Sequence, residues 1–135
     1  MARRRALLCA VLALCATAVF GCGRDAPYVP ASGRTVDLRL DEYRVLPQRV
    51  TVPAGRVRIV GRNVGRLTHN VAVVQFRRPQ GDEEQRQYGR TPTAHPGDVV
   101  ETTVTLRPGR YRLACTIANH DNLGQYGELK VVPAS

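Results

Sequence analysis

Three side chains able to bind a soft or borderline metal lie at regular intervals in one short stretch of the chain. Cys115 offers a thiol, His120 an imidazole and Gln125 an amide oxygen, with four residues between each neighbouring pair. A second imidazole, His69, lies far upstream in the run L-T-H-N. Two imidazoles, one thiolate and a weak fourth ligand are the donor set of trigonal copper sites that transfer electrons. The sequence therefore predicts a mononuclear type 1 copper site at His69, Cys115, His120 and Gln125.

The start of the chain has the features of an export signal. Residues 3–5 are arginines, residues 6–20 form an apolar stretch too short to favour a membrane span, and the run V-F-G-C ends at Cys22. This run resembles a bacterial lipobox, in which the cysteine is lipidated and becomes the new N-terminus, although its phenylalanine departs from the usual small residue. We therefore expect residues 1–21 to be removed and Cys22 to carry lipid. A plain signal, cleaved or uncleaved, is the alternative.

The residues after the signal divide into a tether and one domain. Residues 22–34 contain two glycines and two prolines, which predicts a flexible tether. This tether would hold the domain at the outer face of the cell membrane or in the periplasm. Residues 35–132 are enough for a single domain with one core. We expect this domain to be exported, lipid-anchored and monomeric.

The cysteine count favours a metal-binding role for Cys115. The chain has four cysteines. Cys9 and Cys15 would leave with the signal and Cys22 would carry lipid, so no disulfide can form inside the domain. A lone thiol in an oxidising compartment is a liability unless it is buried and inert or occupied by a metal. An inert buried cysteine is the ordinary alternative, and a zinc ribbon would need paired cysteines that this chain lacks.

The charge of the chain is strongly positive. Its 20 basic residues outnumber 11 acidic ones, and loss of the three arginines at 3–5 leaves 17 against 11, a net charge of +6. The arginines are scattered and form no run beyond Arg77-Arg78, so the pattern does not predict a nucleic-acid interface. A solvated surface with some attraction for acidic partners or anionic headgroups explains the charge.

Seven short β-rich runs separated by turn residues predict an all-β fold. Several alternate apolar and polar residues with period two, as strands with one buried face do. The runs begin at Thr35, Arg49, Arg56, His69, Val99, Arg110 and Tyr126. Strands of this number and length favour an antiparallel β-sandwich. Residues 77–96 lack periodicity and carry several glycines and prolines, which predicts a long excursion loop.

From Thr35 to Val132 the chain resembles the cupredoxin family. The residues that carry the resemblance are V-T-V-P-A-G-R-V at 50–57, G-R-N-V-G with T-H-N at 61–70, L-R-P-G-R-Y-R-L-A-C at 106–115, the ligand loop that follows, and G-E-L-K-V in the last strand. The resemblance implies a Greek-key β-sandwich of seven to eight strands. It also implies copper near one end, with His69 on one strand and the other three ligands on the loop between the last two strands.

The resemblance also bears on the residues around the metal. Most members have methionine at the position of Gln125, and this chain's single methionine is Met1. The spacing and the axial glutamine resemble the stellacyanins, whose disulfide is missing here. A backbone carbonyl at Thr68 is the alternative axial ligand.

In relatives, an asparagine after the first histidine ties the two ligand segments together through the hydroxyl residue after the cysteine. The matching residues are Asn70 and Thr116. An ordinary strand-capping asparagine is the alternative. His95 precedes P-G-D in a turn and is expected at the surface.

The expected function is one-electron transfer by copper to a transient redox protein partner, with the imidazole edge of His120 as the route. A copper-binding or copper-delivering lipoprotein without a redox partner is the alternative, although the lack of methionine speaks against it. A metal-free interaction module is disfavoured by the combination of His69, Cys115 and His120. An enzyme is the weakest class, because a lone type 1 site leaves no open position for substrate.

Overall fold

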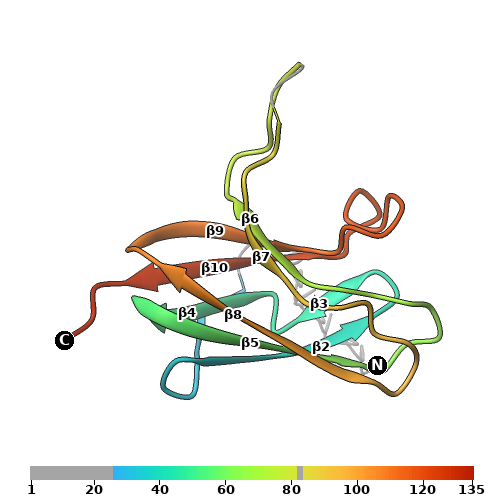
Figure 1. Ribbon diagram of the computed structural model, residues 1–135, viewed down its shortest axis with the longest axis horizontal. Coiled ribbons are helices and arrows are strands. Elements are labelled where there is room, and N and C mark those ends of the chain that lie inside the picture. The colour runs from blue at the N-terminus through green and yellow to red at the C-terminus, as the bar shows by residue number, and fades with distance from the viewer. Residues whose placement is uncertain (1–25, 82–83) are drawn as a thin grey trace, which may run out of the picture.

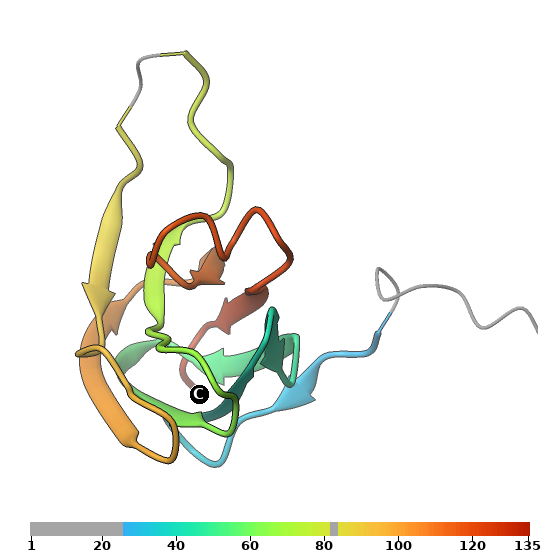
Figure 2. The same cartoon turned by 90° about the vertical axis from the view of Figure 1, so that its right-hand side faces the viewer.

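Two β-sheets packed face to face form the protein (Figures 1 and 2). The computed structural model describes residues 26–81 and 84–135, and this part contains ten strands and no helix. The six-stranded sheet has the order β1 (Val29–Pro30), β4 (Arg49–Pro53), β10 (Tyr126–Val132), β9 (Gly109–Ala114), β6 (Ala72–Gln75) and β7 (Gln87–Arg90). The four-stranded sheet has the order β3 (Arg44–Leu46), β2 (Thr35–Asp41), β5 (Gly55–Asn63) and β8 (Val99–Leu106).

The alternation of apolar residues explains why the two sheets pack together. In β2 every second side chain is buried, and the same holds at the end of β8 and through β10. The buried side chains of both sheets form one continuous core, because alternate residues of a strand point to the same face. Its largest fully buried members are Leu38, Leu40, Ile59, Leu106, Leu113 and Leu129.

The predicted β-sandwich is confirmed, and the strand pairing is more mixed than expected. Three pairs are parallel: β1 with β4, β4 with β10, and β2 with β5. The other pairs are antiparallel. All seven predicted strands are present, and β1, β3 and β7 are additional. The three extra strands have two to four residues each, which is too short for a periodic pattern to stand out.

The predicted loop over residues 77–96 was too long, because part of it is strand β7. This strand pairs with β6 and packs against β8. A Cβ on Gly89 would lie 2.3 Å from a methyl carbon of Val104, so the glycine permits this close approach. Residues 77–81 and 84–86, which precede β7, project well away from the sandwich, as both views show (Figures 1 and 2).

The described part of the predicted tether is packed against the domain. In β1, Val29 and Pro30 pair with β4. The hydroxyl of Tyr28 donates to a carboxylate oxygen of Glu128, and Arg49 donates to the carbonyl of Ala26 at 2.9 Å. Residues 26–34 therefore belong to the folded unit.

The predicted signal at residues 1–21, the lipidation site Cys22 and the rest of the tether lie outside the described residues. Among the residues that are described, no helix is long and apolar enough to cross a membrane.

One end of the sandwich gathers the segments that carry the predicted metal ligands. The connection from β9 to β10, residues 115–125, curls beyond the strand ends away from the C-terminus (Figure 1). His69 lies just before β6, which neighbours β9 in the sheet. The turn between β2 and β3 reaches the same end, since the side chain of Gln125 bonds to Asp41. Three separate segments thus meet there.

Candidate metal centre

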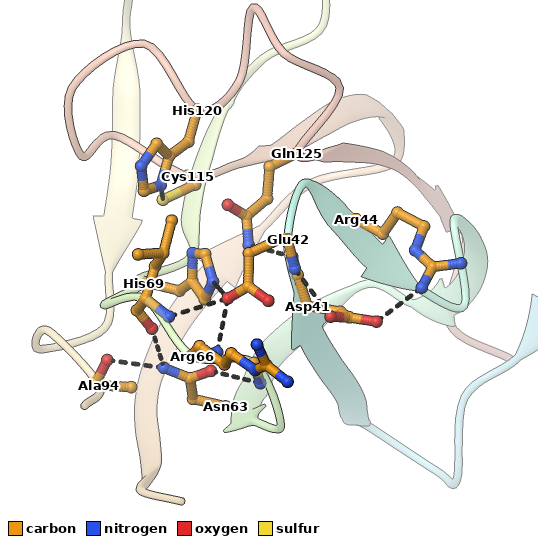
Figure 3. Close-up of polar contacts among 12 residues, drawn as sticks. Asp41, Glu42, Arg44, Asn63, Arg66, His69, Ala94, Cys115, His120 and Gln125 are labelled. Carbon is orange, nitrogen blue, oxygen red and sulfur yellow. Dashed lines mark hydrogen bonds and ion pairs between the residues drawn. The ribbon is translucent and has the colours of Figure 1, made fainter. Parts of the chain in front are cut away.

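His69, Cys115 and His120 converge at this end of the sandwich. One ligand atom from each lies within 4.8 Å of the other two. The thiol sulfur of Cys115 is 3.7 Å from Nδ1 of His120, and the two imidazole rings lie edge to face with centroids 5.3 Å apart. His69 and Cys115 are buried, and His120 is partly exposed. Figure 3 shows the three side chains close together. These spacings suit a single small ion between the three side chains.

Backbone hydrogen bonds close the ligand loop at its base. The N–H of Cys115 donates to the carbonyl of Gln125 at 3.1 Å, and the N–H of Gln125 donates to the carbonyl of His120 at 3.0 Å. Within the loop, Ala118 has a φ of 48°, a left-handed conformation that non-glycine residues seldom adopt. The fold itself therefore fixes the relative positions of Cys115, His120 and Gln125.

A pair of backbone bonds and a buried asparagine hold His69 in place. His69 and Ala94 exchange N–H to carbonyl bonds of 3.0 and 2.7 Å. The side-chain amide of Asn63 donates to the carbonyls of Leu67 and Ala94 at 2.7 and 3.0 Å. The segment before β6 is thus tied to the segment before β8, and the His69 ring is fully buried.

The carboxylate of Glu42 faces one ring nitrogen of His69. Oε1 of Glu42 lies 3.3 Å from Nε2 of His69 and accepts N–H bonds from Leu67 at 2.8 Å and Arg66 at 2.6 Å. The backbone bond from Leu67 leads the interactions that lower the pKa of Glu42 to about 2, so this group is an ionised acceptor at neutral pH. An acceptor can face Nε2 only if that nitrogen is protonated. Nδ1 of His69 then presents a lone pair, and this buried atom has no partner.

Gln125 is oriented in a similar way. Its side chain is fully buried, and its Nε2 donates to the carbonyl of Asp41 at 3.1 Å. Its Oε1 is buried without a partner. In Figure 3 the amide oxygen lies on the side of Cys115 and the nitrogen on the side of Asp41. The oxygen of Gln125, which is the predicted axial ligand, is therefore free to bind a metal ion.

The structure contains the link between Asn70 and Thr116. The side-chain amide of Asn70 donates to the hydroxyl of Thr116 at 3.0 Å, and its oxygen accepts the backbone N–H of Thr116 at 2.8 Å. This connection joins the residue after His69 to the residue after Cys115. Such bonds hold ligands in place with or without a metal.

The donor atoms fit a copper ion. Two buried acceptors, Nδ1 of His69 and Oε1 of Gln125, lack partners beside a buried thiol. Leaving a buried polar group unsatisfied costs about 1–3 kcal/mol, and a cation would satisfy both. Thiolate and imidazole nitrogen together favour copper or zinc over hard cations, and a histidine pair with one cysteine and a weak axial oxygen favours copper. His95 is exposed in its turn and is not part of the cluster.

Sequence reasoning missed the acidic turn that contacts the site. Asp41 and Glu42 carry no motif, and 26 residues separate Glu42 from His69. A carboxylate directly after a buried strand was the only signal, and such residues are common at strand ends. Asn63 was included in a motif but was given no role.

Comparisons with known proteins support the fold. No protein-family model matches the chain, and no curated protein sequence matches it. Among solved structures, a dithionite-reduced auracyanin from the photosynthetic bacterium Roseiflexus castenholzii is 21% identical, with a TM-score of 0.65 over 76% of this chain and 100% of that one. Auracyanin A from Chloroflexus aurantiacus, described as a "blue" copper protein, is 23% identical, with a TM-score of 0.62 over 77% of this chain and 100% of that one.

A third solved structure agrees with the first two. Auracyanin B is 21% identical, with a TM-score of 0.60 over 81% of this chain and 93% of that one. The chain therefore has the cupredoxin-like β-sandwich fold that the sequence predicted.

Proposed function

We infer that the protein is an extracytoplasmic electron-transfer protein with one type 1 copper ion. The proposed ligands are His69, Cys115 and His120, with Gln125 in the axial position. The observation that carries this proposal is the buried thiol and two imidazoles within 4.8 Å, beside two buried acceptors without partners. The likeness to auracyanin A, described as a blue copper protein, supports it.

The environment of each side chain suits electron transfer. Copper in such a site would supply one-electron cycling between Cu(I) and Cu(II). His69, Cys115 and Gln125 are buried and keep water away from the metal position. His120 is partly exposed, and in the same loop Ala118 is exposed and Leu123 is 52% exposed. This small apolar surface would suit a brief contact with a redox protein partner.

Copper binding or delivery without a redox partner is the second candidate. Delivery requires the metal to leave easily, whereas three of the four proposed ligands are buried and hydrogen-bonded in place. The ligands would also fill the coordination positions, so we expect no catalytic activity.

Residues 1–21 would direct export, and lipid on Cys22 would hold the domain at the outer face of a membrane or in the periplasm. Because residues 26–34 pack on the domain, only residues 22–25 would serve as the tether. A monomer held this way would keep the His120 face open to a partner.

A copper titration tests the proposed function. Purified domain from residue 26 onward should bind one equivalent of Cu(II) and develop an intense thiolate-to-copper band that ascorbate bleaches reversibly. His120→Ala should weaken or change the band, whereas the matched control His95→Ala should leave it unchanged. A colourless protein after Cu(II) addition would contradict the electron-transfer proposal. A blue protein that ascorbate cannot reduce would favour copper binding alone.

A further inference from the structure

Three consecutive residues, the last residue of β2 and the first two of the turn that follows it, each contact a different residue of the candidate site. The carbonyl of Asp41 accepts the amide of Gln125, Glu42 accepts Nε2 of His69, and the ring of Tyr43 lies edge to face with His120 at 5.3 Å. The turn is therefore a second layer behind three of the four proposed ligands. It belongs to the sheet opposite β9 and β10, so it also couples the two sheets at the site.

The Glu42 side chain has a prepared position. Its Oε1 accepts backbone N–H groups of Arg66 and Leu67 as well as Nε2 of His69. A Cβ on Gly65 would lie 2.3 Å from Oε1, so the absence of a side chain there makes room for the carboxylate. Two fixed donors and a matching gap hold one oxygen against His69.

We propose that Glu42 is a positioning residue for the copper site, which sets the tautomer of His69 and lowers the reduction potential. This inference rests on the proposed function. A carboxylate that receives the N–H of a ligating imidazole fixes the ring orientation and raises the basicity of the metal-binding nitrogen. Its negative charge, one imidazole ring away from the metal position, favours the more positive Cu(II) over Cu(I).

Two variants separate charge from position. Glu42→Gln keeps an oxygen that can accept the three N–H groups but removes the charge. Gly65→Ala keeps the charge but places a methyl group where the carboxylate oxygen lies, and a flexible side chain can move away without disrupting the fold. Glu101→Gln is the matched control, because it removes an equal charge from an exposed ion pair with Arg58.

The first readout requires no metal. Long-range nitrogen–proton spectra of the apoprotein at pH 8 should show His69 protonated at Nε2 in the wild type. Gly65→Ala should populate the other tautomer. A wild-type His69 protonated at Nδ1 would overturn the positioning role even if the protein turns blue.

The second readout is the reduction potential of the copper-loaded protein. Outer-layer substitutions change metal affinity 10–100-fold, so Glu42→Gln should shift the Cu(II)-to-Cu(I) affinity ratio about tenfold toward Cu(I). A tenfold change is a rise of about 59 mV for one electron. Glu101→Gln should stay at the wild-type value. Equal potentials for Glu42→Gln and Glu101→Gln would overturn the charge effect, whereas failure to bind copper at all would instead contradict the proposed function.

Discussion

The side-chain nitrogen of Gln125 donates to the carbonyl oxygen of Asp41 at 3.1 Å, across the two sheets of the sandwich. This bond uses one N–H of the side-chain amide, and Oε1 of Gln125 is buried without a hydrogen-bond partner. The orientation of the amide is therefore set by the fold rather than by a metal. The oxygen of Gln125, the proposed axial ligand, is consequently available before any ion binds.

Replacing Gln125 by methionine should raise the reduction potential. An amide oxygen is a harder ligand than a thioether, so it favours Cu(II) over Cu(I). We expect a rise of about 100 mV, which for one electron is about 2.3 kcal/mol. Voltammetry and the hyperfine splitting in electron paramagnetic resonance measure the effect.

Gln87→Met on the exposed strand β7 is the matched control and should leave the potential unchanged. An unchanged potential and hyperfine splitting in Gln125→Met would mean that Gln125 does not face the metal. The carbonyl of Thr68 would then be the first candidate for the axial position.

Cys115→Ser should abolish the intense visible band while the domain stays folded. The band requires a thiolate, and Cys115 is not among the residues that form the core between the two sheets. Far-ultraviolet circular dichroism should match the wild type. A variant that kept the intense band would refute the assignment of the whole site.

Asn70→Ala should destabilise the apoprotein. The change removes hydrogen bonds that tie the segment after His69 to Thr116, and Asn70 is buried. Because Thr116 is exposed and water can reach it, a loss of about 1 kcal/mol is expected. For a domain of this size, each kcal/mol lowers the melting temperature by about 4–8 °C.

Thr116→Val is the informative partner variant. It loses the hydroxyl but keeps the backbone N–H that donates to Asn70, so its melting temperature should fall less. Equal losses for both variants would show that the side-chain hydroxyl carries the link.

Glu128→Gln should reduce stability at neutral pH and have little effect in acid. Burial raises the pKa of Glu128, but hydrogen bonds from Arg110 and Tyr28 and the nearby charge of Arg49 outweigh it, so the pKa lies below its usual value. A lowered carboxyl pKa adds stability that is present above the unfolded-state pKa of about 4.3 and is lost as the pH falls below it. The difference in melting temperature from the wild type should therefore shrink between pH 7 and pH 3.

Glu84→Gln provides a comparison at an exposed carboxyl in the segment before β7. It removes the same charge without the contacts of Glu128. If the melting temperature of Glu128→Gln were lowered by the same amount at pH 3 as at pH 7, the loss of stability would come from altered packing or hydrogen bonding and not from the lost charge.

Cys22→Ala should release the protein from the membrane or stall its processing in the native host. Lipid on Cys22 would make the wild-type protein partition into detergent, and alanine cannot accept the lipid. Fractionation and the mass of the mature N-terminus measure this. A wild-type protein found wholly in the medium, with a free N-terminus at another position, would disprove the anchor.

The sequence predicted the long strands and the convergence of His69, Cys115 and His120 better than the short strands and the supporting contacts. Strands such as β2 and β5 can be recognised in the sequence because apolar and polar residues alternate along them, with one face of each strand buried. β7, with the sequence Q-Y-G-R, has no buried residue and forms only because β6 offers an edge. The strand depends on its pairing with β6, and the local sequence of β7 contains no pattern that predicts this pairing.

In the candidate site too, local features could be predicted from the sequence and contacts between distant segments could not. Cys115, His120 and Gln125 share one loop, so their spacing is readable in the sequence. The contact between Glu42 and His69 joins two segments whose meeting depends on how the sheets stack. The role of Gly65 in making room for the carboxylate of Glu42 could not be predicted either, because Glu42 is distant in the sequence.

The backbone bond from the N–H of Cys115 to the carbonyl of Gln125 closes the loop directly beyond Ala114 and Tyr126, the last paired residues of β9 and β10. Residues 117–119 lie outside that pairing, whereas Thr116 is bonded to Asn70. Exchanges confined to residues 117–119 should therefore change the surroundings of His120 and leave the sandwich intact. Under the proposed function, the copper site could then be re-engineered by grafting at these three positions.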